Sequence, residues 1–155
     1  MPNRRIVAID LGTHCGYAIQ ETTGPPANGV LDLSPRQDEG GGMRYLRFLR
    51  WLQEIAPHEV WYEKVASHKG TRAAHVYGGL LGQLQAYCEE LGVPYRGVSV
   101  GTIKKHATGK GNANKAAMIA AAKEKLDYVG DDDNEADALW LLDYVRTVGG
   151  AGPDA

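Results

Sequence analysis

Three acidic residues adjoin apolar segments of this chain, where a charged side chain is costly to bury. Asp10 ends the apolar run 6–10, Glu63 ends the run 60–63, and Asp137 opens an apolar stretch near the C-terminus. Carboxylates that lie close together repel one another and resist removal from water together. A divalent cation relieves both costs, because hard cations such as Mg²⁺ take carboxylate oxygens as ligands. The sequence therefore predicts a metal site formed by these three residues.

The positive charge of the chain gathers in its middle. The net charge is −2, yet residues 64–123 carry nine Lys or Arg against two acidic residues, a net +7 that leaves −9 for the remainder. An enzyme that acts on a polyanion needs such a basic surface beside its acidic metal ligands, because lysines hold the phosphates. From charge alone, a solvated surface without a partner stays the alternative.

Length and composition indicate one soluble domain. With 155 residues, of which 43% are hydrophobic, the chain is long enough for one core and too short for two. We expect a single domain over residues 1–148 and a flexible tail over 149–155. No segment approaches the roughly 20 apolar residues that span a bilayer. Cys15 and Cys88 form neither a zinc ligand set nor a disulfide framework, so we expect a cytoplasmic protein.

Hydrophobic periodicity and turn residues predict an α/β layered domain. The expected strands are 5–10, 16–21, 28–33, 59–63 and 95–100, and the expected helices are 43–56, 72–91, 114–126 and 133–148, with a basic loop after residue 100. The first three strands form a meander, and the later strands alternate with helices. Arg44, Arg47 and Arg50 fall among the polar positions of the first helix.

Four motifs along the chain resemble those of one nuclease family. The pattern D-L-G-T-x-x-G-Y-A, which begins at Asp10, resembles the first motif of the RuvC Holliday-junction resolvases, members of the ribonuclease H-like superfamily. The tripeptide E-K-V at Glu63 is similar to their second acidic motif, and A-D-A-L around Asp137 to their C-terminal one. The basic segment between them is similar too, and the two functional lysines of the family fall on Lys104 and Lys115.

This resemblance covers about residues 5–147 and implies both a fold and an activity. The implied fold is the ribonuclease H-like three-layer α/β fold, with a mixed five-stranded sheet flanked by helices. The implied protein is a structure-specific DNA endonuclease that resolves four-way junctions and leaves 5′ phosphates. The form of residues 134–137 is most similar to the phage-encoded branch, which implies a bacterial host cell.

The resemblance also implies roles for the acidic residues. Two Mg²⁺ ions, which Mn²⁺ can replace, would share Asp10 as a bridging ligand. Glu63 would hold the ion that orients the attacking water, and Asp137 would hold the other ion. Asn134 lies one helical turn before Asp137 and is the predicted fourth ligand.

The basic residues and the long helix complete the expected site. Lys104 and Lys115 are predicted to contact phosphates near the cut or to stabilise transition-state charge. The predicted DNA contacts are Lys64, Lys69, Arg72, Lys104, Lys105, Lys110 and Lys115. Cutting both strands at a junction requires two active sites, which a homodimer supplies. The long helix is the candidate interface, because Gly78, Gly79 and Gly82 indicate close backbone contact within the fold or across a dimer.

Two positions depart from the family pattern. Ala66 stands where the bacterial proteins commonly place an aromatic residue that wedges into the junction, and His68 or Tyr77 are candidates to replace it. Asn134 stands where the family usually has Asp or His, with Asp133 directly before it, so either residue can be the fourth ligand.

Three other functions stay open on the sequence. The strand and turn around Asp10 also resemble the phosphate loop of the sugar-kinase and chaperone ATPases, although no second phosphate loop is present. A junction-binding protein that has lost cleavage through the change at Asn134 is a second alternative. A related nuclease that processes RNA is the third.

Overall fold

Five strands form one mixed sheet in the computed structural model, which describes residues 2–148. In chain order the elements are β1 (Ile6–Asp10), β2 (His14–Gln20), β3 (Ala27–Asp32), α1 (Gly42–Ile55), β4 (Glu59–Lys64), α2 (Thr71–Leu91), β5 (Tyr95–Ser99), α3 (Val100–Thr108), α4 (Lys115–Lys125) and α5 (Asp133–Thr147). The sheet order is β3-β2-β1-β4-β5, with β1, β4 and β5 parallel and β2 and β3 antiparallel to their neighbours. The predicted α/β fold with a mixed five-stranded sheet is confirmed.

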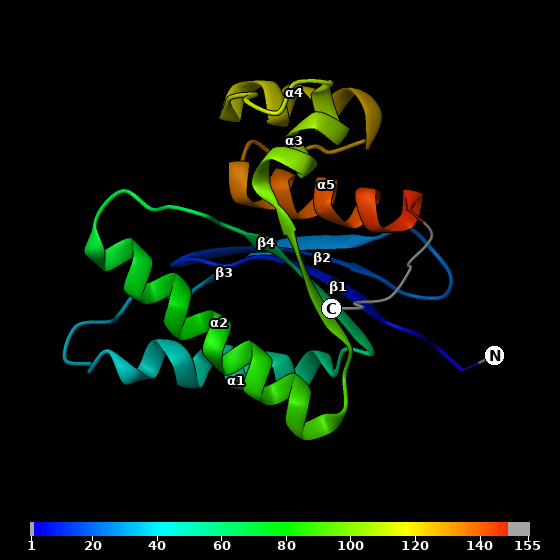
Figure 1. Cartoon of the computed structure of the whole chain (residues 1–155). Helices are drawn as coiled ribbons and strands as arrows, with labels where there is room; N and C mark the ends of the chain where they lie inside the picture. The colour runs from blue at the N-terminus through cyan, green and yellow to red at the C-terminus, as the bar shows by residue number, and fades with distance from the viewer. Residues whose placement is uncertain (1, 149–155) are drawn as a thin grey trace.

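Helices cover both faces of the sheet and give the domain three layers. α1 and α2 lie on one face, and α5 lies on the other with α3 and α4 beyond it (Figure 1). Strand alternation separates two cores: Val7 and Ile9 pack with α1 and α2, whereas Ala8 between them packs with α5. Because the sheet is buried on both faces, the apolar runs of β1 and β4 are continuous rather than alternating.

Small residues let α5 approach the sheet closely. Ala8 and Ala18 face each other across the β1–β2 pair, and both are fully buried under α5. Gly16 is closer still, since a Cβ atom built on it would lie 2.1 Å from the backbone oxygen of Asn134. The first turn of α5 therefore rests on the backbone of β2, beside the end of β1.

The basic loop expected after residue 100 is wrong, because residues 100–108 form the helix α3. The Ser99 hydroxyl caps its N-terminus by accepting a hydrogen bond from the Thr102 N–H. Ile103 and Ala107, one turn apart, bury its inner face against α4 and α5. Gly109 ends the helix with a φ of 84°, in the left-handed region. The basic segment is thus two helices joined by a turn.

The three glycines of α2 play different parts. A Cβ atom on Gly79 would lie 2.5 Å from the ring of Tyr45, so this glycine serves the packing of α1 on α2. A Cβ atom on Gly78 or Gly82 would meet nothing within 4 Å, which leaves this part of the helix surface open. The predicted tail over 149–155 lies outside the described residues. Within residues 2–148, no helix is both long and apolar enough to cross a bilayer.

Gly16→Ala should destabilise the protein, because the new methyl group would overlap the backbone of α5 and force the helix from the sheet. We expect a loss of about 1–3 kcal/mol in the free energy of unfolding, measured by urea denaturation. Gly12→Ala is the matched control, since a Cβ atom there would meet nothing within 4 Å. Equal unfolding midpoints for the two variants would contradict the close approach of α5.

Candidate active site

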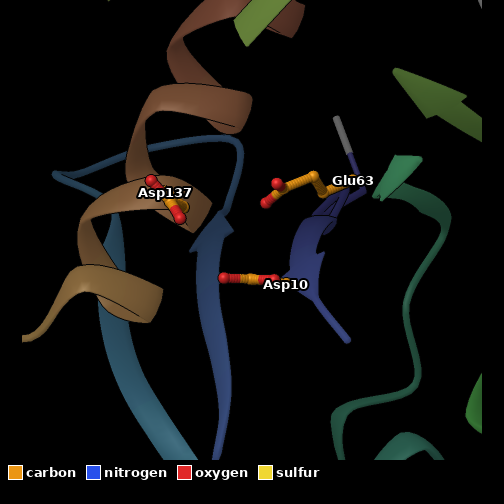
Figure 2. Close-up of side chains that lie close together, drawn as sticks. All are labelled: Asp10, Glu63 and Asp137. Carbon is orange, nitrogen blue, oxygen red and sulfur yellow. The ribbon is translucent and has the colours of Figure 1, made fainter. Parts of the chain in front are cut away.

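Asp10, Glu63 and Asp137 converge at one edge of the sheet. Each offers an oxygen atom to a set whose members all lie within 4.8 Å of one another. β1 and β4 are parallel neighbours, so Asp10 and Glu63 leave the sheet at the same edge, and Asp137 reaches them from α5 (Figure 2). The structure therefore brings together the three carboxylates predicted as metal ligands. No other group of three or more His, Cys, Asp or Glu side chains this close occurs within residues 2–148.

Glu63 is a buried carboxylate whose hydrogen bonds are incomplete. Its side chain is only 9% exposed, and its Oε2 atom is buried without a hydrogen-bond partner. Glu59, on the same strand and 1% exposed, has partners for its carboxylate: it accepts a hydrogen bond from Trp61 Nε1 at 2.5 Å and forms an ion pair with Arg4. A buried carboxylate oxygen without such partners is an acceptor that a bound cation would satisfy.

Burial raises the pKa of all three carboxyl groups, and neighbouring negative charges add to the effect. Burial, followed by the charges of Glu63 and Asp137, raises the pKa of Asp10 well above its usual value. Burial raises the pKa of Asp137 to about 8, and the charges of Glu63 and Asp133 add to the effect. Burial also raises the pKa of Glu63, although a hydrogen bond with Asp10 and the charge of Lys104 act against it. Without a cation, the cluster therefore retains protons at neutral pH.

The cluster has the chemistry that a hard divalent cation requires. All three side chains offer carboxylate oxygens, the oxygens are close together, and the orphaned Oε2 of Glu63 is an acceptor without a donor. A bound cation would replace the protons and remove the repulsion among the carboxylates. The residues present thus fit the metal site expected from the sequence.

Asp133, one turn before Asp137 on α5, also acts on this cluster. Its charge raises the pKa of Asp10, Glu63 and Asp137 alike. Its Oδ2 atom lies 3.3 Å from Lys115 Nζ, so it links the carboxylates to the first residue of α4. The backbone of the neighbouring residue, Asn134, packs against Gly16. The role of Asn134 as the fourth ligand stays a prediction.

Lys104 and Lys115 are the predicted basic residues that reach the carboxylates. The charge of Lys104 lowers the pKa of both Glu63 and Asp137, and the charge of Lys115 lowers that of Asp137. Lys115 is positioned by Asn114, which caps α4 by accepting a hydrogen bond from the Ala117 N–H at 2.8 Å. The other predicted DNA contacts are exposed: Lys64, Lys69, Arg72, Lys105 and Lys110.

Two contacts that hold α3 in place were not foreseen from the sequence. His106 Nε2 lies 2.8 Å from Asp143 Oδ2, and the imidazole ring makes edge contacts with Trp140 and Tyr144 of α5. These contacts hold α3, the helix that carries Lys104, against α5, the helix that carries Asp137. No local sequence signal reveals a pair separated by 37 residues.

Tyr77 supports the end of β4 rather than projecting into solvent. Its hydroxyl donates a hydrogen bond to the Glu63 carbonyl at 3.0 Å and accepts one from the Val65 N–H at 3.2 Å. The side chain is 8% exposed, so Tyr77 cannot wedge into a junction as one of the two candidates proposed from the sequence. His68, partly buried, packs on the Tyr77 ring at a centroid distance of 4.8 Å.

The sheet order and its flanking helices define a ribonuclease H-like fold, with a cluster of three carboxylates that could hold a metal ion at the ends of β1 and β4. Solved structures agree on the fold. T. thermophilus RuvC in complex with a Holliday junction substrate aligns with a TM-score of 0.72 at 22% identity, covering 97% of this chain and 98% of that one. The fowlpox virus resolvase, solved with its Holliday junction substrate, aligns with a TM-score of 0.60 at 16% identity, covering 92% and 99%.

A sequence relative gives the family. The crossover junction endodeoxyribonuclease RuvC of Anaeromyxobacter sp. (strain K) is 31% identical over 142 residues, which cover 86% of this chain and 76% of that protein. No protein-family model matches the chain. The chain belongs to the RuvC family, which confirms the resemblance drawn from the motifs.

The raised pKa values predict how stability depends on pH when divalent cations are removed. The folded protein binds more protons at this site than the unfolded chain between about pH 4, the ordinary carboxyl pKa, and about pH 8, the pKa of Asp137. The stability from this site is complete below the lower value and is lost as the pH rises through the upper one. In EDTA, Tm should therefore fall progressively between about pH 4 and about pH 8, by about 2–4 °C for each kcal/mol lost.

Asp137→Asn should reduce the fall of Tm with pH, because the amide carries no charge at any pH. A divalent cation should raise the Tm of the natural protein at the upper end of this pH range. Asp38→Asn is the control, since Asp38 is exposed and has a φ of 70°, which Asn tolerates. If Tm falls with pH equally in the natural protein, Asp137→Asn and Asp38→Asn, repulsion among the carboxylates does not cause the fall.

Proposed function

We propose that this protein is a structure-specific DNA endonuclease that resolves four-way junctions by metal-dependent phosphodiester hydrolysis. One observation carries the proposal: three repelling carboxylates from β1, β4 and α5 share a space within 4.8 Å, next to two lysines. Membership of the RuvC family supports the substrate, because the relatives are named for crossover junctions or were solved with Holliday junction DNA.

We propose Mg²⁺ as the metal, with two ions at each site and Mn²⁺ as a substitute. Asp10 offers an oxygen within 4.8 Å of both other carboxylates and would be suited to serve both ions, with Glu63 holding one ion and Asp137 the other. When bound, the ions supply an activated water and charge stabilisation for the departing 3′ oxygen. The protein contributes a rigid frame, since Asp10 and Glu63 stand on paired strands and Asp137 stands on a helix packed against backbone.

The lysines of α3 and α4 are suited to the phosphate that reacts. Lys104 and Lys115 bring positive charge to the rim of the carboxylate cluster, where the phosphate of a bound strand must lie. Their charge would stabilise the additional negative charge of the transition state. Lys105 and Lys110, which are exposed on the same segment, extend this basic surface along the strand.

A homodimer remains the proposed assembly. Symmetric cutting of two strands requires two copies of the site related by a two-fold axis. The open helix surface around Gly78 and Gly82 is the candidate contact, because α2 there has no side chain to hold another helix away. The phage origin and the cytoplasmic location likewise stay predictions from the sequence.

Asp10→Asn should abolish cleavage of a labelled four-way junction in Mg²⁺, while junction binding persists or improves. The reason is that the substitution removes a metal ligand and at the same time lowers the negative charge that meets the DNA. Binding is measured in Ca²⁺ by gel shift, with linear, three-way and RNA duplexes as comparison substrates. Asp38→Asn removes an equal charge elsewhere and should cut normally. Junction binding without metal-dependent cutting by the natural protein would instead support a junction-binding protein that has lost catalysis.

The fourth ligand can be assigned by two substitutions on α5. If Asn134 is the ligand, Asn134→Asp should lower the Mg²⁺ concentration for half-maximal cleavage, because it adds a charge, and Asp133→Asn should matter little. If Asp133 is the ligand, Asp133→Asn should cripple cleavage and Asn134→Asp should be neutral. The measurement is single-turnover cleavage across a Mg²⁺ titration. No effect from either variant would leave Asp10, Glu63 and Asp137 as the complete protein ligand set.

A further inference from the structure

A pocket of about 500 Å³ with three cationic side chains in its lining lies on the α1–α2 side of the domain. Its walls come from the β1–β2 turn, the segment after β3, and the first turns of α1 and α2. The polar residues that line it are Thr13, Ser34, Arg44, Lys69 and Arg72. Three of these side chains are cationic, and none is acidic. Asp32, which accepts a hydrogen bond from the Ser34 N–H, is exposed and does not line the pocket.

Arg44 is the feature of this pocket that calls for a ligand. It is only 7% exposed, its Nε atom is buried without a hydrogen-bond partner, and none of the ion pairs of the described residues includes it. Arg47, one turn later on α1, instead forms a two-point ion pair with Glu39. A guanidinium stays protonated in proteins, and a buried cation without an anion is strongly unfavourable. An anion is therefore the missing partner of Arg44.

The helix ends around the pocket favour the same kind of ligand. α1 begins after Gly41 and α2 begins after Gly70, and neither N-terminus has a side-chain cap or an acidic residue in its first turn. The N–H groups and the positive end of the helix dipole at such a terminus attract anions, above all phosphates. Arg44 and Arg72 stand in these first turns, so their charges add to those of the helix ends.

The pocket is connected to the catalytic carboxylates along the chain. Thr13 lies in the short turn that follows Asp10, and Lys69 lies in the loop that follows Glu63 and β4. Both segments leave the sheet at the edge where the carboxylates converge. Lys104 and Lys115 belong to α3 and α4, on the other side of the sheet (Figure 1), so these lysines and the pocket flank that edge from two sides.

We propose that this pocket binds a backbone phosphate of the DNA strand that is cut, at a position away from the reacting phosphate. The inference rests on the proposed function and adds a second anchor to it. The Arg44 guanidinium makes paired hydrogen bonds to the phosphate oxygens, and Lys69 and Arg72 close over them. Because a phosphate contact carries no sequence information, the pocket fixes the register of the strand across the carboxylates rather than the sequence that is read.

The test compares two arginines of α1. Arg44→Gln should weaken junction binding in Ca²⁺ by about tenfold, the effect of losing a charge-assisted hydrogen bond, and should reduce the slope of binding against salt by about one. Arg50→Gln removes the same charge from an exposed position of the same helix and should change neither quantity. Arg44→Lys should restore part of the affinity. Equal effects of the Arg44→Gln and Arg50→Gln variants would overturn the proposal.

The substrate arm locates the phosphate. Four-way junctions that carry one neutral methylphosphonate linkage at successive positions beside the cut are bound to each protein. At one of these positions, the neutral linkage should weaken junction binding by the natural protein. The same linkage should not weaken junction binding by the Arg44→Gln variant any further. If no position behaves in this way, the pocket does not hold the DNA. If Tm shows that the Arg44→Gln variant does not fold, the double variant Lys69→Gln/Arg72→Gln replaces it in the binding and methylphosphonate experiments. The results expected of the double variant, and those that would overturn the proposal, are the same.

A third arm separates this inference from the proposed function. Inorganic phosphate should raise the Tm of the natural protein and not that of Arg44→Gln, and junction DNA should displace the phosphate. Stabilisation by phosphate with unchanged junction affinity in Arg44→Gln would mean a site for a free anion and would overturn the DNA assignment. If the natural protein neither binds nor cuts junctions, the proposed function is refuted. The change of Tm with inorganic phosphate would then still show whether the pocket binds an anion.

Discussion

Repulsion among three half-desolvated carboxylates is the constraint around which this domain is arranged. Asp10, Glu63 and Asp137 are held within 4.8 Å of one another, where their charges and their burial act against folding. The fold opposes this cost with two apolar cores, one on each face of the sheet. The site is thus prepared for cations before any arrive, and the energy that a cation recovers on binding is stored in the folded chain.

Each of the two outer helix layers contributes cationic side chains that a polyanion could contact. The layer of α3, α4 and α5 supplies Asp137, Lys104 and Lys115, which we propose act on the reacting phosphate. The layer of α1 and α2 supplies the cationic pocket around Arg44. The sheet edge between them carries Asp10 and Glu63, so these carboxylates have cationic side chains in the layers on both sides. A nucleic-acid strand that follows this edge can meet cations from both layers.

The sequence predicted the strands and the acidic ligands well, because both rest on local signals. Asp10 and Glu63 end apolar runs, and the edge at which parallel strands finish follows from the topology. The helix α3 was missed because it buries only two residues, Ile103 and Ala107, too few for a clear helical pattern. The contact of His106 with Asp143, which holds α3 on α5, joins residues 37 positions apart and leaves no local signal. Tyr77 was misassigned because a sequence does not show that a hydroxyl has two backbone partners. Arg44 was placed on a polar face, yet it is buried.

The contact between α5 and bare strand backbone has a consequence for redesign. Beneath the first half of α5 the sheet presents Ala8, Gly16 and Ala18, so the height of the helix is set by backbone atoms that cannot change rotamer. The far side of the helix, by contrast, meets Met118 and Ile103 through flexible side chains. That outer core can be repacked with side chains of similar volume while the ligand on α5 keeps its position, because the sheet acts as a fixed stop. Repacking this outer core can therefore change thermostability while the sheet keeps Asp137 in place, whereas Lys104 and Lys115 move with the helices that are repacked.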